Sequence, residues 1–289
     1  MKFSIILATL NRSEIVKKSI ISILNQTYKN YEIIIIDQST NDDTKVNISK
    51  LINNKKNNIS YYKVDFTGLS KARNFGIKKS TGNYICLMDD DAEYRVDFLD
   101  KASKILKKYK YDIISGLIIE KETKRTFCPI MENKEKEIIN YKNINLCSSA
   151  SLVINKSTII NKVGMFDEML GAGAYFGAGE EIDLLIRSLN LNYKIYYDKE
   201  LVVYHPYPVN NFDKKDCMRA YSYGLGEGAL CKKTIKASSI KNKKIFIFKF
   251  SINIIRTMCA IIVFFRQPNK KNFYIARIKG LVQGYQTYK

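Results

Sequence analysis

The sequence predicts an α/β protein with a mostly parallel sheet flanked by helices, followed by a helical C-terminal extension. Short apolar runs rich in β-branched residues, such as FSIILA (3–8) and YEIIIID (31–37), have the composition of strands buried on both faces. These runs alternate with segments of helical spacing, and from about residue 212 onward the pattern is helical and basic. Alternating strands and helices form βαβ units, which pair parallel strands.

The alternation is clearest in residues 1–92. Parallel sheets bind their ligands beyond the carboxyl ends of the strands. Asp37 and the triple aspartate 89–91 directly follow two of the predicted strands, so we expect a binding site at that edge. The predicted strands span 3–8, 31–37, 58–64 and 83–88, and the predicted helices span 13–25, 42–53 and 69–80.

Beyond residue 92 the alternation is less regular. The glycine-rich segment 164–179 is expected to be a loop, and His205, the only histidine, ends the last predicted strand. We predict a domain at 1–210, divided into halves 1–92 and 93–210, and a helical, basic and amphipathic region at 211–289. Further predicted helices span 94–109 and 180–190, strands span 112–119, 146–154, 193–198 and 200–205, and a charged connection spans 120–143.

The chain is strongly basic, with 48 Lys and Arg against 28 Asp and Glu among 289 residues and a net charge of +20. This balance favours an anionic partner: a nucleic acid, a nucleotide or an acidic membrane surface. The alternative is a compositional bias, because Lys, Asn and Ile are abundant together. Apolar residues make up 46% of the chain, which excludes a disordered protein.

The six cysteines include no CxxC pair, so the sequence shows no zinc or redox motif. Free thiols fit a reducing compartment. The N-terminus, MKFSIILATLNR, has too short an apolar stretch for a signal peptide and is interpreted as a first strand. We therefore expect a cytoplasmic protein.

Four stretches carry a family likeness when taken in order. They are SIILATLNR (4–12) with LNQTY (24–28), EIIIIDQSTNDDT (32–44), GLSKARNFGIKKSTGNYICLMDDD (68–91), and the segment from GMFDEM to VVYHP (164–206). Together they resemble the family 2 glycosyltransferases, which have the nucleotide-diphospho-sugar transferase fold known as GT-A. The likeness covers roughly the first 205 residues.

The resemblance implies a metal and diphosphate site at the triple aspartate. Asp91 would bind the ion, Asp89 would face the ribose or the ion, and Asp90 would lie beside them. His205 matches a histidine that completes the site in many members. Carboxylate oxygens suit Mn²⁺ or Mg²⁺, and the ion would neutralise the acids. The alternatives are a solvated acidic turn that caps the next helix and a structural histidine.

The resemblance also implies nucleotide contacts. Thr9, Leu10 and Asn11 would surround the base, and Asp37 and Arg73 would face the nucleotide. Gln38 stands where the family usually has an acid that reads the base, and its amide can both accept and donate hydrogen bonds. Uracil and thymine are favoured, and guanine stays open. The alternative for Asp37 is a residue that only starts a turn after its strand. The alternative for Arg73 is an exposed charge on a helix surface.

The stretch GAGEEIDLLIRSL (177–189) resembles the acidic motif that supplies the catalytic base. By position the base is Glu181, and Glu180 is the competing assignment. Two adjacent carboxylates disfavour double ionisation, which helps one of them act as a base. The alternative is that acids merely stabilise a helix N-terminus. Asp183 and Arg187 have the spacing of a structural ion pair.

Residues 245–265 are nearly all apolar. Lys249 and Arg256 would be costly at the centre of a membrane span. With Asn253 and Gln267 they fall on one narrow helical face, which is typical of a helix lying in a membrane interface. The alternative is a helix that packs on the catalytic domain with its basic face exposed.

We therefore expect a metal-dependent, inverting hexosyl- or deoxyhexosyltransferase. Its partners would be a UDP- or dTDP-sugar, a polyprenyl-linked glycan acceptor and an anionic membrane surface, without nucleic acid. It would act at the inner face of the cell membrane in capsule or O-antigen assembly. Two other classes stay open: a nucleotidyltransferase, although LATLNRS lacks a glycine-rich phosphate loop, and a non-enzymatic basic protein that binds RNA or membrane.

Overall fold

A computed structural model describes residues 1–54, 58–128, 131–207 and 209–289. The chain forms two compact units. Unit 1 contains residues 1–67, 71–165 and 191–207, and unit 2 contains residues 68–70, 166–190 and 208–289. This grouping does not follow the predicted boundary at 210/211, because the segment 166–190 packs with the C-terminal helices. The predicted domain boundary at 210/211 stays a prediction.

The sheet of unit 1 begins with a parallel half in the order β3-β2-β1-β4. These strands are β1 (Phe3–Thr9), β2 (Tyr31–Asp37), β3 (Ile59–Lys63) and β4 (Tyr84–Asp89). Every residue of β1 and β2 is buried, as the continuous apolar runs predict. Their register pairs Thr9 with Asp37 and Ala8 with Asp89, so the polar residues reach the same edge.

The other half of the sheet is mixed. Strand β9 pairs in parallel with β6 and antiparallel with β5 and β7, while β8 pairs antiparallel with β4 and β6. The predicted strands 193–198 and 200–205 form the single strand β9. The strands are β5 (Glu93–Tyr94), β6 (Ile113–Ile119), β7 (Lys136–Ile138), β8 (Val153–Asn155) and β9 (Ile195–Tyr204).

The predicted strand 146–154 is wrong over most of its length. Two 3₁₀ turns, Ile144–Leu146 and Ser149–Ser151, precede the short strand β8. The serine-rich sequence explains the difference, because Ser151 Oγ donates to the Ser148 carbonyl at 3.1 Å and competes with strand pairing.

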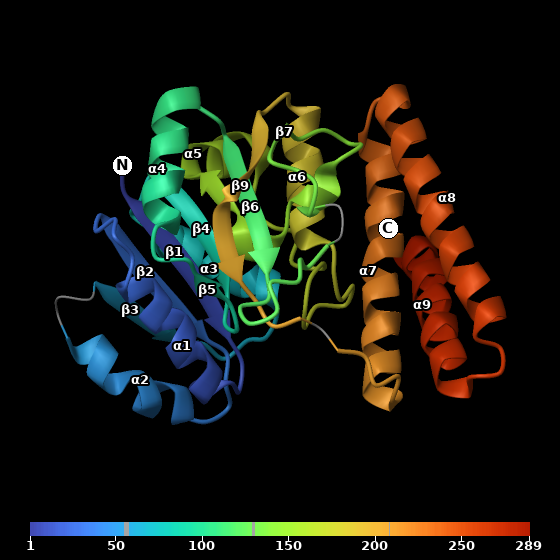
Figure 1. The fold of residues 1–289 in the computed structure, drawn as a ribbon, viewed down its shortest axis with the longest axis horizontal. Helices are drawn as coiled ribbons and strands as arrows, with labels where there is room; N and C mark the ends of the chain where they lie inside the picture. Colours follow the sequence, from blue (N-terminus) through green and yellow to red (C-terminus); the bar gives the residue numbers. More distant parts are fainter. Residues whose placement is uncertain (55–57, 129–130, 208) are drawn as a thin grey trace. The chain divides into compact units, whose positions relative to one another are not determined.

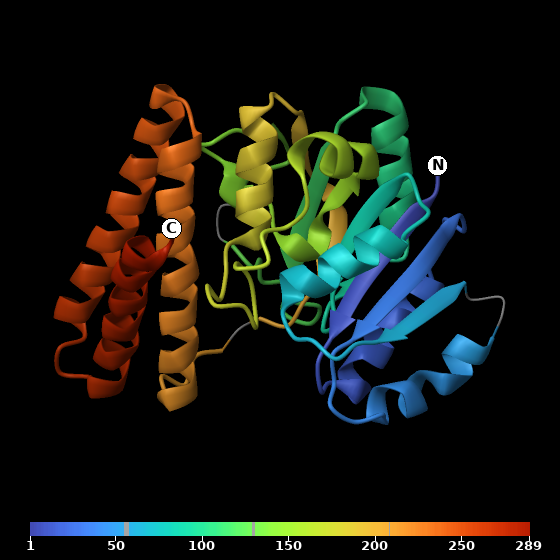
Figure 2. The ribbon, with the colours of Figure 1, turned by 180° about the vertical axis from the view of Figure 1, so that it is seen from behind.

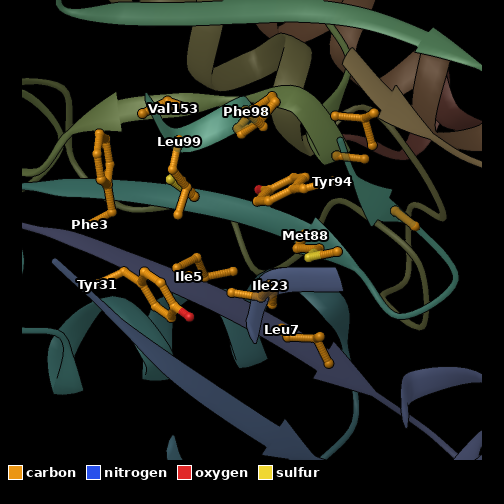
Figure 3. Packing of buried hydrophobic residues seen from close by; sticks show 14 of the residues in the cluster. Phe3, Ile5, Leu7, Ile23, Tyr31, Met88, Tyr94, Phe98, Leu99 and Val153 are labelled. Atoms are coloured by element: carbon orange, nitrogen blue, oxygen red, sulfur yellow. The ribbon is translucent and has the colours of Figure 1, made fainter. Parts of the chain in front are cut away.

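Helices cover both faces of this sheet (Figures 1 and 2). Helices α1 (Ser13–Leu24), α2 (Asp43–Asn53) and α4 (Phe98–Tyr109) bury their apolar residues against the face that carries Phe3, Ile5 and Leu7. Figure 3 shows this core, in which Tyr94 stacks on Phe98. Helix α3 (Leu69–Lys79) lies on the opposite face. A short helix, α5 (Lys156–Thr158), and a π-helical turn, Ile159–Val163, follow β8.

Unit 2 is helical. It contains α6 (Glu180–Asn190), α7 (Lys214–Ala237), α8 (Ile240–Val263) and α9 (Pro268–Thr287), and the last three lie side by side (Figures 1 and 2). Helices α7 and α9 approach so closely that a Cβ on Gly228 would lie 2.1 Å from the Leu281 carbonyl oxygen. Glycines at 224, 228, 280 and 284 all meet the partner helix's backbone in this way, so small residues set the crossing.

Candidate active site

The carboxyl edge of the parallel strands brings several predicted residues of unit 1 together. Thr9 ends β1, Asp37 ends β2 and Asp89 ends β4, and the strand register aligns the three. The backbone N–H of Gln38 donates to the Thr9 carbonyl at 2.9 Å, which extends the pairing past the strand ends. The sheet therefore fixes the distances among these groups.

Asp90 anchors the acidic turn to the fold. Its Oδ2 accepts a hydrogen bond from Thr9 Oγ1 at 2.8 Å, its Oδ1 pairs with Arg12 Nη1 at 2.8 Å, and its carbonyl accepts from Ser19 Oγ at 2.7 Å. Burial raises the pKa of Asp90, and these hydrogen bonds offset part of that effect. Because both carboxylate oxygens are engaged, the geometry gives Asp90 a structural task. Its predicted place beside the diphosphate stays a prediction.

Asp91 and His205 face each other, with His205 Nε2 3.1 Å from Asp91 Oδ1. Arg12 Nη1 lies 3.0 Å from Asp91 Oδ2. Burial opposes ionisation of Asp91, but His205 and Arg12 outweigh it and lower its pKa. The imidazole is fixed by its other nitrogen, since Nδ1 lies 2.8 Å from the Pro206 carbonyl oxygen, and by an edge contact with Phe127.

This pair fits a divalent ion that shares its coordination with a substrate. Within the described ranges no three His, Cys, Asp or Glu side chains come together as a complete metal site. Asp91 offers a hard carboxylate oxygen, which suits Mn²⁺ or Mg²⁺. His205 offers an imidazole nitrogen, a softer donor that fits Mn²⁺ better than Mg²⁺. The remaining positions would be taken by phosphate oxygens and water, as is usual for Mg²⁺.

Arg73 is buried, with 1% of its surface exposed. Its Nη2 pairs with Asp89 Oδ1 at 3.0 Å, while Ser149 Oγ lies 3.4 Å from Asp89 Oδ2. A buried guanidinium needs a carboxylate partner, so this pair orients Asp89 at the end of β4. Direct contact of Arg73 with a nucleotide stays a prediction.

Asp37 is fully buried at the end of β2. Its Oδ1 accepts from the Ser39 backbone N–H at 2.9 Å, and its Oδ2 accepts from Tyr61 OH at 2.6 Å. Burial and this contact raise the pKa of Tyr61. Lys63 Nζ lies 3.6 Å from the same carboxylate. These contacts therefore fix the Asp37 side chain in place.

Gln38, Leu10 and Asn11 form the outer part of this edge. Gln38 is buried, and among the described residues its Oε1 has no hydrogen-bond partner. A buried acceptor without a partner is costly unless a ligand supplies a donor. Leu10 is 41% exposed. Asn11 adopts φ +55° and donates its N–H to Ser39 Oγ at 2.8 Å.

Three residues of the site were not singled out from the sequence: Arg12, Tyr61 and Ser149. Arg12 stands directly after the predicted contacts Thr9–Asn11, so its place at the strand end was a usable signal. Tyr61 and Ser149 carried no such signal, because each meets its aspartate only through the sheet.

The acidic pair Glu180 and Glu181 starts α6 in unit 2, as predicted. Gly179 precedes it with φ +95°, which favours glycine. Glu180 is buried, and its Oε2 lies 3.1 Å from where a Cβ on Gly171 would be. Glu181 is only half-buried. The two acids therefore differ in access to solvent.

Further along α6, the predicted pair of Asp183 and Arg187 is present at 2.9 Å. Lys233 on α7 joins Asp183 at 2.9 Å and Asp167 at 2.6 Å, and Tyr288 OH donates to Asp167 at 3.0 Å. This network ties the loop before α6 to the C-terminal helices and so supports the position of the acidic pair.

Sequence comparison decides the family. The profile described as "Glycosyl transferase family 2" matches residues 4–162. The chain belongs to glycosyl transferase family 2. The resemblance predicted from the four sequence stretches is thereby confirmed.

The relatives of this family 2 chain are bacterial glycosyltransferases. Glycosyltransferase GlyA of Streptococcus pneumoniae serotype 4 is 31% identical over 115 residues, which are 40% of this chain and 16% of GlyA. A relative named GalNAc(5)-diNAcBac-PP-undecaprenol beta-1,3-glucosyltransferase, from Campylobacter jejuni, is 29% identical over 122 residues, which are 42% of this chain and 40% of the relative. The match with GlyA and with the next Rickettsia relatives thus spans less than a fifth of their length.

Solved structures confirm the GT-A fold. Residues 1–349 of S. aureus TarS, crystallised with UDP-GlcNAc, match with a TM-score of 0.61 at 16% identity, covering 96% of this chain and 90% of that TarS chain of residues 1–349. The mannosyltransferase PcManGT from Pyrobaculum calidifontis, with GDP-Man and Mn²⁺, matches with a TM-score of 0.65 at 12% identity, covering 98% of this chain and 86% of PcManGT. At these identities the likeness shows the fold.

Proposed function

We propose that this family 2 member moves a sugar from a nucleoside-diphosphate sugar to a hydroxyl group of a glycan acceptor, with inversion. The observation that carries the proposal is the shared strand edge. There Thr9, Asp37 and Asp89 align, and Asp91 lies 3.1 Å from His205. A nucleotide-binding edge next to a site that suits a divalent ion is what activation of a diphosphate leaving group requires.

Asp91 and His205 would hold Mn²⁺ or Mg²⁺, with Asp89 turned toward the ribose or the ion. When bound, the ion would stabilise the negative charge of the leaving diphosphate. The structure with GDP-Man and Mn²⁺ supports a divalent ion on this fold. Arg73 keeps Asp89 in place, and Thr9 with Arg12 keeps the turn in place.

Gln38 would read the base through its buried Oε1. The N3–H of uracil or thymine is a donor of the kind that this acceptor lacks. TarS with UDP-GlcNAc supports a uridine donor, whereas PcManGT with GDP-Man keeps guanine open. We infer that the donor is a UDP- or dTDP-sugar.

Glu181 would be the general base. It takes the proton from the acceptor hydroxyl, and that oxygen attacks the anomeric carbon as the bond from this carbon to the diphosphate oxygen breaks. One in-line displacement inverts the anomeric configuration. Glu181 is favoured over Glu180 because it is the more exposed of the two. The sugar would be a hexose or deoxyhexose.

The acceptor would be a polyprenyl-linked glycan at the inner face of the cell membrane, in capsule or O-antigen assembly. The Campylobacter relative supports this choice, because its name describes a glycan linked to undecaprenol. The excess of positive charge supports an anionic surface as a partner.

Calorimetric or thermal-shift titration with UDP, dTDP and GDP, with and without Mn²⁺, tests the donor site. We expect Mn²⁺-dependent stabilisation by one uridine or thymidine diphosphate. The variant Asp91→Asn should lose the Mn²⁺ dependence, while Asp100→Asn on α4, where Asp100 pairs with Lys104, should keep it. A folded protein that responds to none of the three nucleotides, or an unchanged response in Asp91→Asn, would overturn the proposal.

A further inference from the structure

We propose that helix α8 attaches unit 2 to an anionic lipid bilayer, lying in the plane of the interface with its outward face among the lipid chains. The inference deepens the proposed function, on which it rests for the choice of a membrane as the partner. Helix α8 exposes a stripe of apolar side chains, and basic residues lie near both of its ends.

Most exposed residues of α8 are apolar, apart from Lys244, Ser251 and Arg256 among the side chains that the structure describes. Ile247, Phe248, Ile255, Met258, Ile262 and Val263 are all exposed. Phe248 is 67% exposed and Ile262 71%. Residues 248, 255 and 262 are spaced by seven, which places them on one side of a helix. The stripe is therefore continuous over about 20 Å, at 1.5 Å per residue.

Two polar residues of α8 are bonded within unit 2. Asn253 Nδ2 donates to Glu227 Oε2 of α7 at 3.1 Å, and Arg277 of α9 pairs with Glu227 Oε1. Thr257 is buried and donates to the Asn253 carbonyl oxygen at 2.8 Å. The half-buried positions of α8 include Phe246, Phe250 and Ile254, so α8 is apolar on both sides, whereas a helix that faces water is polar on its outer side.

Within the described residues, one stretch, Asn242–Val263, is long and apolar enough to cross a membrane. Crossing is disfavoured here because α8 packs with α7 and α9, which would enter the hydrocarbon with it. Lys232 and Lys236 on α7 and Lys279 on α9 would then lose water. An in-plane position buries the outward stripe alone and leaves these lysines hydrated.

The charge around α8 selects an anionic surface. Residues 240–289 contain eight lysines and three arginines, and no aspartate or glutamate. Lys243 and Lys244 lie at one end of the apolar stripe, and Arg266 and Lys270 lie beyond the other. Basic residues beside a buried apolar face are what binds helices to acidic lipid headgroups.

Vesicle co-sedimentation of the full chain tests the attachment. We expect binding to phosphatidylcholine vesicles with about 30% phosphatidylglycerol, weaker binding to pure phosphatidylcholine, and partial release by salt. The double variant Phe248→Gln/Ile262→Gln should bind about 10-fold more weakly. The matched control is Val46→Gln on α2, since Val46 is exposed to the same 71% as Ile262, and it should bind like the wild type.

Depth measurement tests the orientation. The chain has no tryptophan, so Phe248→Trp, Ile255→Trp and Ile262→Trp each give one reporter for quenching by brominated lipids. An in-plane helix gives the same shallow depth at all three positions. A greater depth at position 255 than at the other two would show a spanning helix and overturn the inference.

Two other outcomes would also overturn it. One is wild-type protein that leaves anionic vesicles unbound while still responding to nucleotide and Mn²⁺, in which case the proposed function stands without the docking. The other is a dimer in light scattering that Phe248→Gln/Ile262→Gln dissociates, which would assign the stripe to a second copy of the chain. Vesicle binding without a nucleotide response would instead contradict the proposed function alone.

Discussion

Three aspartates can follow one another at 89–91 because each carboxylate has its own partner. Asp89 pairs with Arg73, Asp90 with Thr9 and Arg12, and Asp91 with His205 and Arg12. From the sequence we expected a metal ion to neutralise all three acids. The protein's own cations already do so in part, which would leave the proposed ion to act on Asp91 and the phosphates of the donor.

Arg12 would therefore compete with the proposed metal ion for Asp91. We expect Arg12→Gln to bind Mn²⁺ about 2- to 5-fold more tightly in the absence of nucleotide, because it removes a half-exposed ion pair worth up to about 1 kcal/mol. The measurement is a Mn²⁺ titration followed by electron paramagnetic resonance.

Lys17→Gln is the control for Arg12, since Lys17 on α1 bonds to Asn47 and not to the acids. It should leave the Mn²⁺ affinity unchanged. Equal or weaker Mn²⁺ binding by Arg12→Gln would show that Arg12 does not compete with the ion for Asp91.

The roles of Glu180 and Glu181 should be distinguishable when the two variants are compared. We expect Glu181→Gln to lower kcat by about 10²- to 10⁴-fold with an unchanged melting temperature, as for loss of a general base. Glu180→Gln should lower the melting temperature, because its carboxylate is buried beside Gly171. Donor turnover and thermal unfolding of both variants distinguish the roles. The reverse pattern would make Glu180 the base.

At the scale of elements, Glu32 joins three pieces of the sheet edge. Its carboxylate accepts from Ser4 Oγ on β1 at 2.5 Å, from the Thr81 backbone N–H at 2.6 Å and from Lys2 Nζ at 3.0 Å. Burial alone would raise the pKa of Glu32, but these contacts outweigh it and lower the pKa to about 2.

Folding stability should therefore fall in acid. The folded pKa of Glu32 lies below the ordinary glutamate value of 4.5, so its contribution to stability is complete above that value and is lost as the pH falls toward about 2. Between about pH 6 and pH 3 we expect a loss of about 2 kcal/mol of unfolding free energy. Urea denaturation of the wild type and Glu32→Gln should show their difference shrinking by this amount. A difference that does not change with pH would contradict the expectation.

The crossing of α7 and α9 depends on glycine. A Cβ on Gly284 would lie 2.0 Å from the Leu225 carbonyl oxygen. We expect Gly284→Ala to destabilise unit 2 by about 1–3 kcal/mol, although alanine favours helices. Thermal unfolding checks this, with Gln283→Ala as the exposed neighbour on α9. A more stable Gly284→Ala protein would show that the helices have room to separate.

Elements were predictable where one local pattern prevailed. The strands β1, β2 and β4 and the helix α6 follow their apolar periods and flanking turns closely. The structure of residues 146–154 was not predictable in this way. Ser151 donates to the Ser148 carbonyl, and such local hydrogen bonds compete with strand pairing. Likewise 193–198 and 200–205 became the single strand β9, since β6 pairs with both parts of it across an irregularity between Asp198 and Val202.

On the scale of the whole molecule, charge is unevenly distributed. The basic excess of residues 240–289 amounts to eleven charges, over half of the chain's +20, so the positive charge is concentrated in the C-terminal part of unit 2. The compact units also differ from the predicted domains, because Lys233 and Tyr288 bind the loop and helix at 166–190 to the C-terminal helices. Compositional bias is the alternative explanation for the positive charge, and it accounts for the number of lysines. It does not account for residues 240–289, which contain no aspartate or glutamate.

The sequence by itself determined the family, the alternation of strands and helices, and the placing of acids at strand ends, since these follow from short-range periodicity and motif order. Only the tertiary structure decided which cation each aspartate meets, and which apolar residues of α8 stay exposed. A helix that is apolar on several sides can bury any of them, and the neighbouring helices decide which one is covered. Here Asn253 of α8 bonds to Glu227 of α7, and Phe248, Ile255 and Ile262 remain exposed for the proposed partner.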